Sequence, residues 1–121
     1  MGYRSKVIVG VKKGILSKEF DEILKKHDFQ LDQPHTDHLV VGEIDEYKTY
    51  TFDYIKWYHD DEWCREIMLF LGKMDDYKID KQDGIDNVFC LGMGEDGNLH
   101  SEIGDYYEYV DTIRDIELIT N

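Results

Sequence analysis

The chain has 121 residues, the length of a single domain, and 41% of them are hydrophobic, so residues 1–121 can bury one core without disulfides or a metal. Acidic residues outnumber basic ones by 27 to 14, and the net charge of −13 argues against non-specific binding of nucleic acid or of an anionic membrane. The acidity has two interpretations. It keeps the protein soluble, or it forms a face that meets a basic protein or imitates nucleic acid.

The two cysteines, Cys64 and Cys90, lie among apolar neighbours and are predicted to be buried free thiols. The chain opens without a charged and then apolar leader, and it contains no run of about 18 apolar residues. We therefore expect a soluble, cytoplasmic protein.

The first part of the chain predicts a strand, a short helix and a loop. Residues 5–11 read SKVIVGV and are rich in β-branched side chains, which favour a strand. Ser17 is a candidate N-cap for a helix over residues 18–27, where apolar side chains recur at helical spacing. Residues 32–37 contain the only proline and predict a loop.

The middle of the chain predicts a hairpin followed by a second helix. Residues 38–44 and 47–58 predict two strands, and Asp45–Glu46 would form the turn between them. Asp60 or Asp61 would cap the helix, and the apolar residues that follow recur at intervals of three and four.

The last part of the chain predicts further strands. Residues 88–93 are an apolar run that predicts a strand, and residues 94–98 (GEDGN) are typical of a turn. A fifth strand is predicted to begin near Leu99. Residues 106–119 mix β-branched, aromatic and acidic side chains and predict an extension of that strand or a further one.

The order of these elements predicts an α+β fold. Strands that are joined by short turns favour antiparallel pairing, so we expect a mostly antiparallel sheet of about five strands with two helices packed on one face. The strand–helix–strand units in each half are also compatible with a ferredoxin-like arrangement.

The sequence offers no convincing catalytic group. Ser101 lies beside His100, but neighbours along a strand point to opposite faces, so we expect that pair not to act together. Cys64 and His59 are loosely spaced for a thiol–imidazole pair. Paired carboxylates are expected by chance among 27 acids. We therefore predict that the protein is not an enzyme.

Three segments resemble metal or phosphate motifs, and each lacks a required part. His35 and His38 have no further ligands at the spacing of a closed zinc site. A calcium-like segment around Gly84 lacks the acidic residues that begin and end such a loop. Residues 92–97 spell GxGxxG, but no predicted helix follows them, so a hairpin turn is the better interpretation. The sequence predicts neither a metal nor a cofactor.

Residues 54–66 read YIKWYHDDEWCRE and hold four aromatic rings beside a lysine and an arginine. If Tyr50 and Phe52 face the helices, Ile55 and Trp57 face the open side of the sheet; the opposite register buries Trp57 and exposes the tyrosines. Either way one aromatic row lacks cover from two helices. That row would be core or dimer packing, a stacking surface for a ligand, or an interface with another protein.

Three short motifs follow one another along the chain: GYRSKV at residues 2–7, YIKWY at residues 54–58 and LGMGED at residues 91–96. In this order they resemble a widespread group of small phage and prophage proteins with a YRS-type start, an IKWY-type strand and a GED-type turn. The resemblance implies a compact α+β domain in the host cytoplasm that serves the phage against its host. Gly92 and Met93 stand where that group tends to carry an Arg-Ile pair, so an anion contact of that arginine would be lost here.

Two functions of different classes agree with these observations. In the first, a non-enzymatic counter-defence protein sequesters a small nucleotide-like immune signal, with charge from Arg4, Lys56 and Arg65 and stacking from Trp57 and Tyr58. In the second, an acidic protein inhibits a host defence complex, such as a CRISPR effector, through its carboxylates. We prefer the first, and both are compatible with a homo-oligomer.

Overall fold

A five-stranded antiparallel sheet and two helices make up most of the structure, a computed structural model that describes residues 4–27, 39–55, 57–58, 60–76, 87–104, 110–111 and 117–118. The elements are β1 (Ser5–Lys12), α1 (Ile15–Lys26), β2 (Leu39–Ile44), β3 (Tyr47–Ile55), α2 (Glu62–Asp76), β4 (Val88–Gly94), β5 (Leu99–Ile103), β6 (Val110–Asp111) and β7 (Glu117–Leu118). The α+β fold predicted from the sequence is confirmed. The predicted loop at residues 32–37 and the calcium-like segment lie outside the described residues.

The sheet has the order β2-β3-β1-β4-β5, and β1 is its central strand. Strands β1 and β2 are both antiparallel to β3, which lies between them, so they are parallel to each other. This is the ferredoxin-like arrangement of a split β-α-β unit, with β5 added at one edge. Consecutive strands β2 and β3 are joined by the predicted two-residue turn at Asp45–Glu46.

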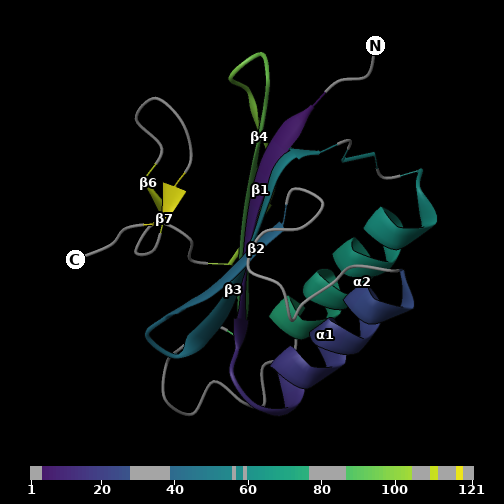
Figure 1. Cartoon of the computed structure of the whole chain (residues 1–121), viewed down its shortest axis with the longest axis vertical. Coiled ribbons are helices and arrows are strands. Elements are labelled where there is room, and N and C mark those ends of the chain that lie inside the picture. The colour runs from purple at the N-terminus through teal and green to yellow at the C-terminus, as the bar shows by residue number, and fades with distance from the viewer. Residues whose placement is uncertain are drawn as a thin grey trace.

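Both helices cover the same face of the sheet, as Figure 1 shows with the sheet seen nearly edge-on. Phe20 of α1 lies between the two layers and between the helices, with its ring centroid 4.6 Å from that of Tyr50 and 5.6 Å from that of Phe70. The buried residues of this core are Val7, Val9, Val11, Phe20, Leu24, Leu39, Tyr50, Phe52, Trp57, Cys64, Ile67, Leu71, Val88 and Cys90.

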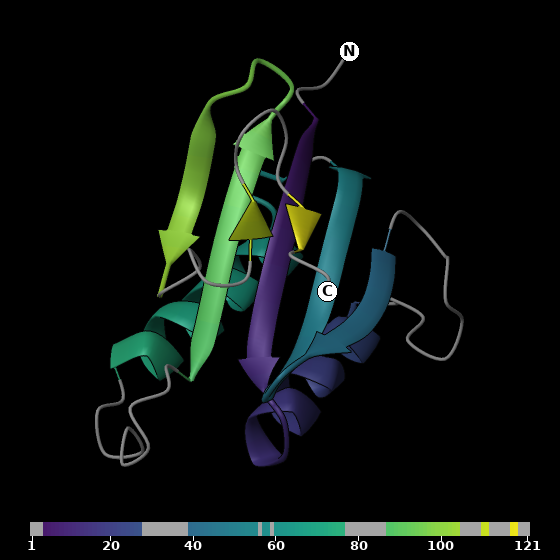
Figure 2. The same cartoon turned by 90° about the vertical axis from the view of Figure 1, so that its left-hand side faces the viewer.

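The opposite face of the sheet is also buried, which corrects the expectation that one side stays open. Ile8, Tyr47, Phe89 and Leu91 form a second apolar cluster there, and each is at most 1% exposed. The short ladder of β6 and β7 lies over this face, on the side away from the helices in Figure 1 and in front of the sheet in Figure 2. The two helices therefore enclose only one of the two apolar clusters of the sheet.

Helix α1 begins at Ile15, three residues earlier than predicted, because Ser17 caps it from inside. The Ser17 Oγ accepts a hydrogen bond from the Gly14 N–H at 3.1 Å and donates one to the Gly14 carbonyl at 3.0 Å. Gly14 is the N-cap and has a φ of 116°, a value that favours glycine. Ser17 was predicted to cap the helix from the position before it. In the structure Ser17 is the third residue of the helix and caps it from there.

Candidate functional site

Trp57, the principal stacking residue of the sequence hypothesis, lies in the core between the helices and the sheet. It is 5% exposed, and its ring contacts those of Phe52 and Trp63 at centroid distances of 5.4 Å each. An indole that is enclosed in this way has no free face for a stacked base. The ligand role of Trp57 therefore gains no support from its position.

A β-bulge in β3 explains why Trp57 faces the helices. Ser5 pairs with Ile55 while Val7 pairs with Phe52, so two residues of β3 stand opposite one residue of β1. The extra residue reverses the alternation of side chains along β3. Phe52, Ile55 and Trp57 consequently all pack against the helix-side core, whereas strict alternation would place Ile55 and Trp57 on the other face.

The other predicted ligand residues come from different elements of the fold. Arg65 is exposed on α2, and Tyr58 is partly buried just before that helix. Lys56 lies outside the described residues. Arg4 lines a pocket at the start of β1.

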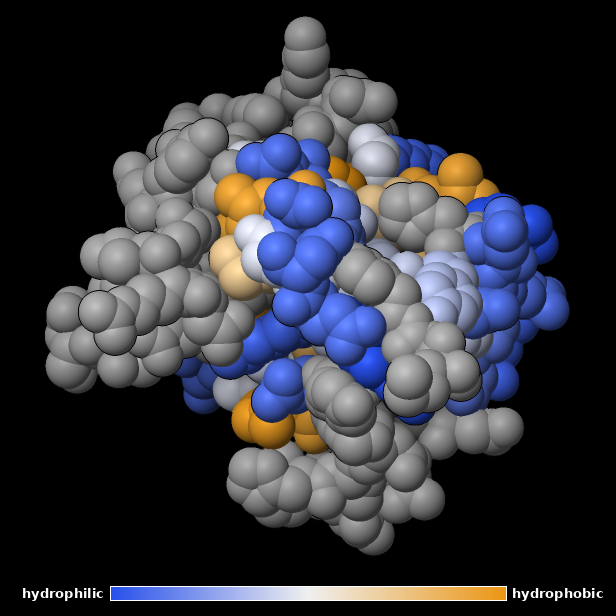
Figure 3. All heavy atoms as spheres, turned by 90° about the horizontal axis from the view of Figure 1, so that it is seen from above, coloured by the Kyte–Doolittle hydropathy of each residue, from blue (hydrophilic) through white to orange (hydrophobic). Residues whose placement is uncertain are grey.

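That pocket lies at the end of the sheet where β1 begins and the β4–β5 hairpin turns, and its volume is about 150 Å³. Its lining includes two cationic side chains and two carboxylates. The lining residues are Arg4, Ser5, Lys6, Asp53, Met93, Gly94 and Glu95. Figure 3 looks onto this end of the molecule, where the described surface is mainly hydrophilic with smaller hydrophobic areas.

Strand alternation brings the charged side chains of the pocket together. Arg4 and Lys6 are two residues apart, so they project to the same side of β1, on the face away from the helices. Lys6 pairs with Met93, a residue that packs against the second apolar cluster on that face. The two cations at alternate positions could be recognised in the sequence. The two carboxylates that line the same pocket come from distant parts of the chain, Asp53 in β3 and Glu95 in the β4–β5 turn.

The start of β1 is tied to the β4–β5 turn through backbone contacts of Arg4 and Glu95. The Glu95 N–H donates to the Arg4 carbonyl at 2.9 Å, and the Arg4 N–H donates to the Glu95 Oε1 at 3.3 Å. The YRS-type start and the GED-type turn, which are 91 residues apart in the sequence, therefore meet at this pocket.

His100 forms a polar cluster that the sequence analysis did not anticipate. Its Nε2 lies 3.0 Å from the Ser5 Oγ, and its Nδ1 lies 2.9 Å from the Ser101 Oγ. The expectation that His100 and Ser101 point apart is wrong, because Ser101 has a φ of 54° at a shift of register between β4 and β5. Alternation fails where a residue leaves the extended conformation.

A second hollow of about 310 Å³ lies near the turn between β2 and β3 and is lined by Lys13, Val41, Gly42, Glu43 and Lys48. Its two lysines are already engaged. Lys13 pairs with Glu43 at 2.7 Å, and Lys48 pairs with Asp21 of α1 at 2.7 Å.

Both thiols are buried in the helix-side core. Burial, with a smaller contribution from the charge of Asp61, raises the pKa of Cys64 to about 12. Burial also raises the pKa of Cys90 above its ordinary range. A thiol that is protonated at neutral pH and closed to solvent is a poor nucleophile, and the prediction of buried free thiols is confirmed.

Two searches of the described part of the chain give negative results. No helix there is both long enough and apolar enough to cross a membrane. No group of three or more His, Cys, Asp or Glu side chains in the described segments could hold a metal ion. His35 and His38, the metal-like pair of the sequence, lie outside those segments, so the prediction about them stays a prediction.

Comparisons with protein-family models, with curated proteins and with solved structures each find no match to this chain.

Proposed function

We propose that this protein acts by binding a small anionic, nucleotide-like ligand, whose phosphate end is held in the pocket at the start of β1. The observation that carries the proposal is that Arg4, just before β1, and Lys6, within β1, line the same pocket. Arginine and lysine bind phosphate through charge-assisted hydrogen bonds, and a single arginine can form two of them. The protein as a whole has a net charge of −13, so the two cations attract an anionic ligand only in their immediate surroundings.

The size of the pocket defines how much of a ligand it takes. A volume of about 150 Å³ is below the range of roughly 300–1,000 Å³ that is typical for sites that enclose a whole drug-sized ligand. A phosphate with its adjoining atoms fits, and the remainder of a nucleotide would lie on the surface. None of the lining residues is aromatic, so charge and hydrogen bonds rather than stacking would supply the affinity.

The same geometry favours binding over catalysis. The thiols are buried and protonated, and Asp53 and Glu95 stand beside cations instead of forming a carboxylate pair in unlike environments. The resemblance to small phage and prophage proteins supports a counter-defence role, in which the ligand is a signalling nucleotide that the host uses against infection.

Titration calorimetry and thermal shift with inorganic phosphate, ADP-ribose and cyclic nucleotides test this proposal. We expect at least one phosphate compound to raise the melting temperature, because a ligand that binds only the folded state stabilises it. Arg4→Gln should abolish that shift. Lys25→Gln, a change of an exposed lysine on α1, is the matched control and should preserve it. The absence of any shift at millimolar ligand would overturn the proposal.

A second function is favoured by the charge of the molecule. Asp60 and Asp61 are exposed just before α2, and Glu95 and Asp96 are exposed in the turn between β4 and β5. An acidic inhibitor of a basic host defence protein, such as a CRISPR effector, would use such a surface. Its complex should weaken steeply between low and high salt, and a complex that is unaffected by salt would exclude charge mimicry.

A further inference from the structure

The His100 cluster lies directly behind the proposed anion pocket. Ser5 is 3% exposed, and on one face of β1 its hydroxyl group contacts the imidazole ring of His100. Ser5 stands between Arg4 and Lys6 in the sequence, and adjacent residues of a strand project to opposite faces. The two cations and the Ser5 hydroxyl therefore lie on opposite sides of the same short piece of backbone.

Two unusual backbone features bring the ring of His100 to Ser5. Gly92 lacks the Cβ that would lie 2.5 Å from the His100 Cε1, so the ring occupies the space above β4. Ser101 holds a φ of 54°, a strained conformation that non-glycine residues rarely adopt. Strain of this kind persists where the surrounding structure requires it, and here it places the Ser101 hydroxyl on the second ring nitrogen.

The hydrogen bonds of the cluster can be kept in every protonation state of the ring. A serine hydroxyl both donates and accepts, so Ser5 and Ser101 can satisfy either neutral tautomer or the imidazolium ion by rotation. The contact between His100 and Ser5 is therefore a durable link between β5 and the start of β1. It adds to the two hydrogen bonds between Arg4 and Glu95 at the same end of the strand, one of which is accepted by the Glu95 carboxylate.

We infer that His100 is the positioning residue of the anion pocket: by holding Ser5 on one face of β1, it fixes the side chains of Arg4 and Lys6 on the other. This inference rests on the proposed function, because it assigns the device that prepares that site. The ligand class is a phosphate group. Pre-ordering two cations lowers the entropic cost of binding, which otherwise includes the immobilisation of two long side chains.

The test uses the full chain and inorganic phosphate, together with whichever nucleotide of the panel binds the unmodified protein. We expect His100→Ala and Ser5→Ala each to weaken binding about fivefold to tenfold, the factor that one hydrogen bond of about 1–1.4 kcal/mol represents. His100→Gln, which can still reach Ser5 with an amide group, should restore most of the affinity. Tyr50→Phe, a core change away from the pocket, is the control for general destabilisation and should bind normally.

A ligand-free measurement separates this inference from the proposed function. In amide NMR spectra, His100→Ala should increase the fast motion of the Arg4 and Lys6 amides, and His100→Gln should not. If the unmodified protein binds no phosphate compound, the proposed function fails whatever the amides show. If it binds, and His100→Ala leaves both the affinity and the amide order unchanged, the positioning role is overturned.

Discussion

At the scale of single residues, the carboxylate of Asp21 connects the buried phenol of Tyr50 with a lysine. The Tyr50 hydroxyl donates to the Asp21 Oδ1, and Lys48 reaches the other carboxylate oxygen at 2.7 Å. Burial, followed by the hydrogen bond and the negative charge of Asp21, raises the pKa of Tyr50 far above its ordinary value of 10. One side-chain cluster thus joins α1 to β3.

We expect Tyr50→Phe to lower the free energy of unfolding by about 1.5–3 kcal/mol, the contribution of a hydrogen bond to a charged group. Urea denaturation at pH 7 measures this difference. An unchanged midpoint would mean that the hydroxyl group contributes nothing to the folded state.

The same residue predicts a loss of stability in alkali. The folded protein retains the Tyr50 proton where the unfolded chain releases it near pH 10, so this contribution is fully present below pH 10 and falls as the pH rises further. We expect the unfolding midpoint of the unmodified protein to fall between pH 10 and pH 11.5, and that of Tyr50→Phe to fall less. Parallel curves for the two proteins would contradict this assignment.

At the scale of elements, the close fit between β1 and β4 depends on a glycine. Phe89 pairs with Gly10, and a Cβ at Gly10 would lie 2.0 Å from the Phe89 ring. The ring also meets Tyr47 edge-on, with centroids 5.0 Å apart. A side chain at position 10 would therefore displace an aromatic pair of the second apolar cluster.

We expect Gly10→Ala to lower the free energy of unfolding by about 1–3 kcal/mol or more, because the core is overpacked there. Gly72→Ala is the matched control. Nothing lies within 4 Å of a Cβ at Gly72 in α2, and alanine favours a helix by up to about 1 kcal/mol over glycine. Denaturant melts of the two variants should shift in opposite directions, and equal shifts would refute the packing argument.

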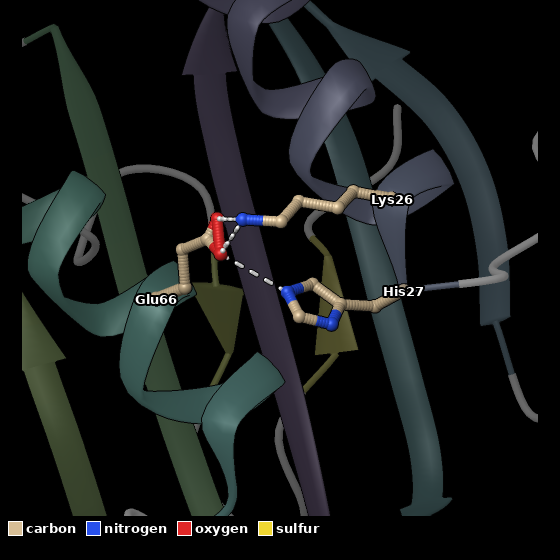
Figure 4. A network of polar contacts seen from close by, with 3 residues as sticks. All are labelled: Lys26, His27 and Glu66. Carbon is tan, nitrogen blue, oxygen red and sulfur yellow. Dashed lines mark hydrogen bonds and ion pairs between the residues drawn. The ribbon is translucent and has the colours of Figure 1, made fainter.

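The two helices are joined by the carboxylate of Glu66, which lies between the side chains of Lys26 and His27, as Figure 4 shows. The Glu66 Oε1 of α2 lies 2.9 Å from the Lys26 Nζ and 3.1 Å from the His27 Nε2, at the end of α1. The hydrogen bonds from Lys26 and His27 lower the pKa of Glu66 below its ordinary value. The network is partly open to solvent, so salt weakens it.

We expect Glu66→Gln to lower the melting temperature at pH 7 and low salt, since the charge that holds both partners is lost. A lowered carboxyl pKa stabilises the folded state above the ordinary value of 4.5, and this contribution disappears as the pH falls through the folded value. The difference in melting temperature between the two proteins should therefore narrow as the pH falls below 4.5, and also at high salt. Glu22→Gln, at an exposed position of α1, is the control and should melt like the unmodified protein.

At the scale of the whole molecule, the sheet is covered on both faces by different parts of the chain. The helices cover one face, and the ladder of β6 and β7 lies over Ile8, Tyr47, Phe89 and Leu91 on the other. Burial of one such side chain is worth roughly 1.5–3 kcal/mol. The second cluster is therefore a large part of the marginal stability of a single domain.

We expect removal of residues 105–121, which include β6 and β7, to lower the melting temperature and to create binding of the dye ANS, because the outer cluster becomes exposed. Calorimetry and dye fluorescence at neutral pH measure both effects. A truncated protein that melts at the same temperature and binds no dye would show that this face is stable without the ladder.

Local patterns were enough to predict the order of the elements and the fold class. A run of β-branched residues predicted β1, an apolar run predicted β4, and apolar residues three and four apart predicted α1 and α2. Their ends were predicted less well: β3 stops at Ile55 instead of Tyr58, and α1 starts at Ile15 instead of Lys18. The bulge depends on the pairing of β3 with β1, which no single segment specifies, whereas the cap is a local contact between Gly14 and Ser17.

The sequence by itself determined the charge, the element order and the antiparallel α+β class, because these follow from residue counts and short-range periodicity. The tertiary structure alone decided that Trp57 is buried, that His100 meets Ser5, and that Asp53 and Glu95 stand beside Arg4 and Lys6. Partners separated by as many as 95 residues meet only when strand register and bulges are set. Register is a property of the assembled sheet, and a one-residue shift changes which side chains share a face.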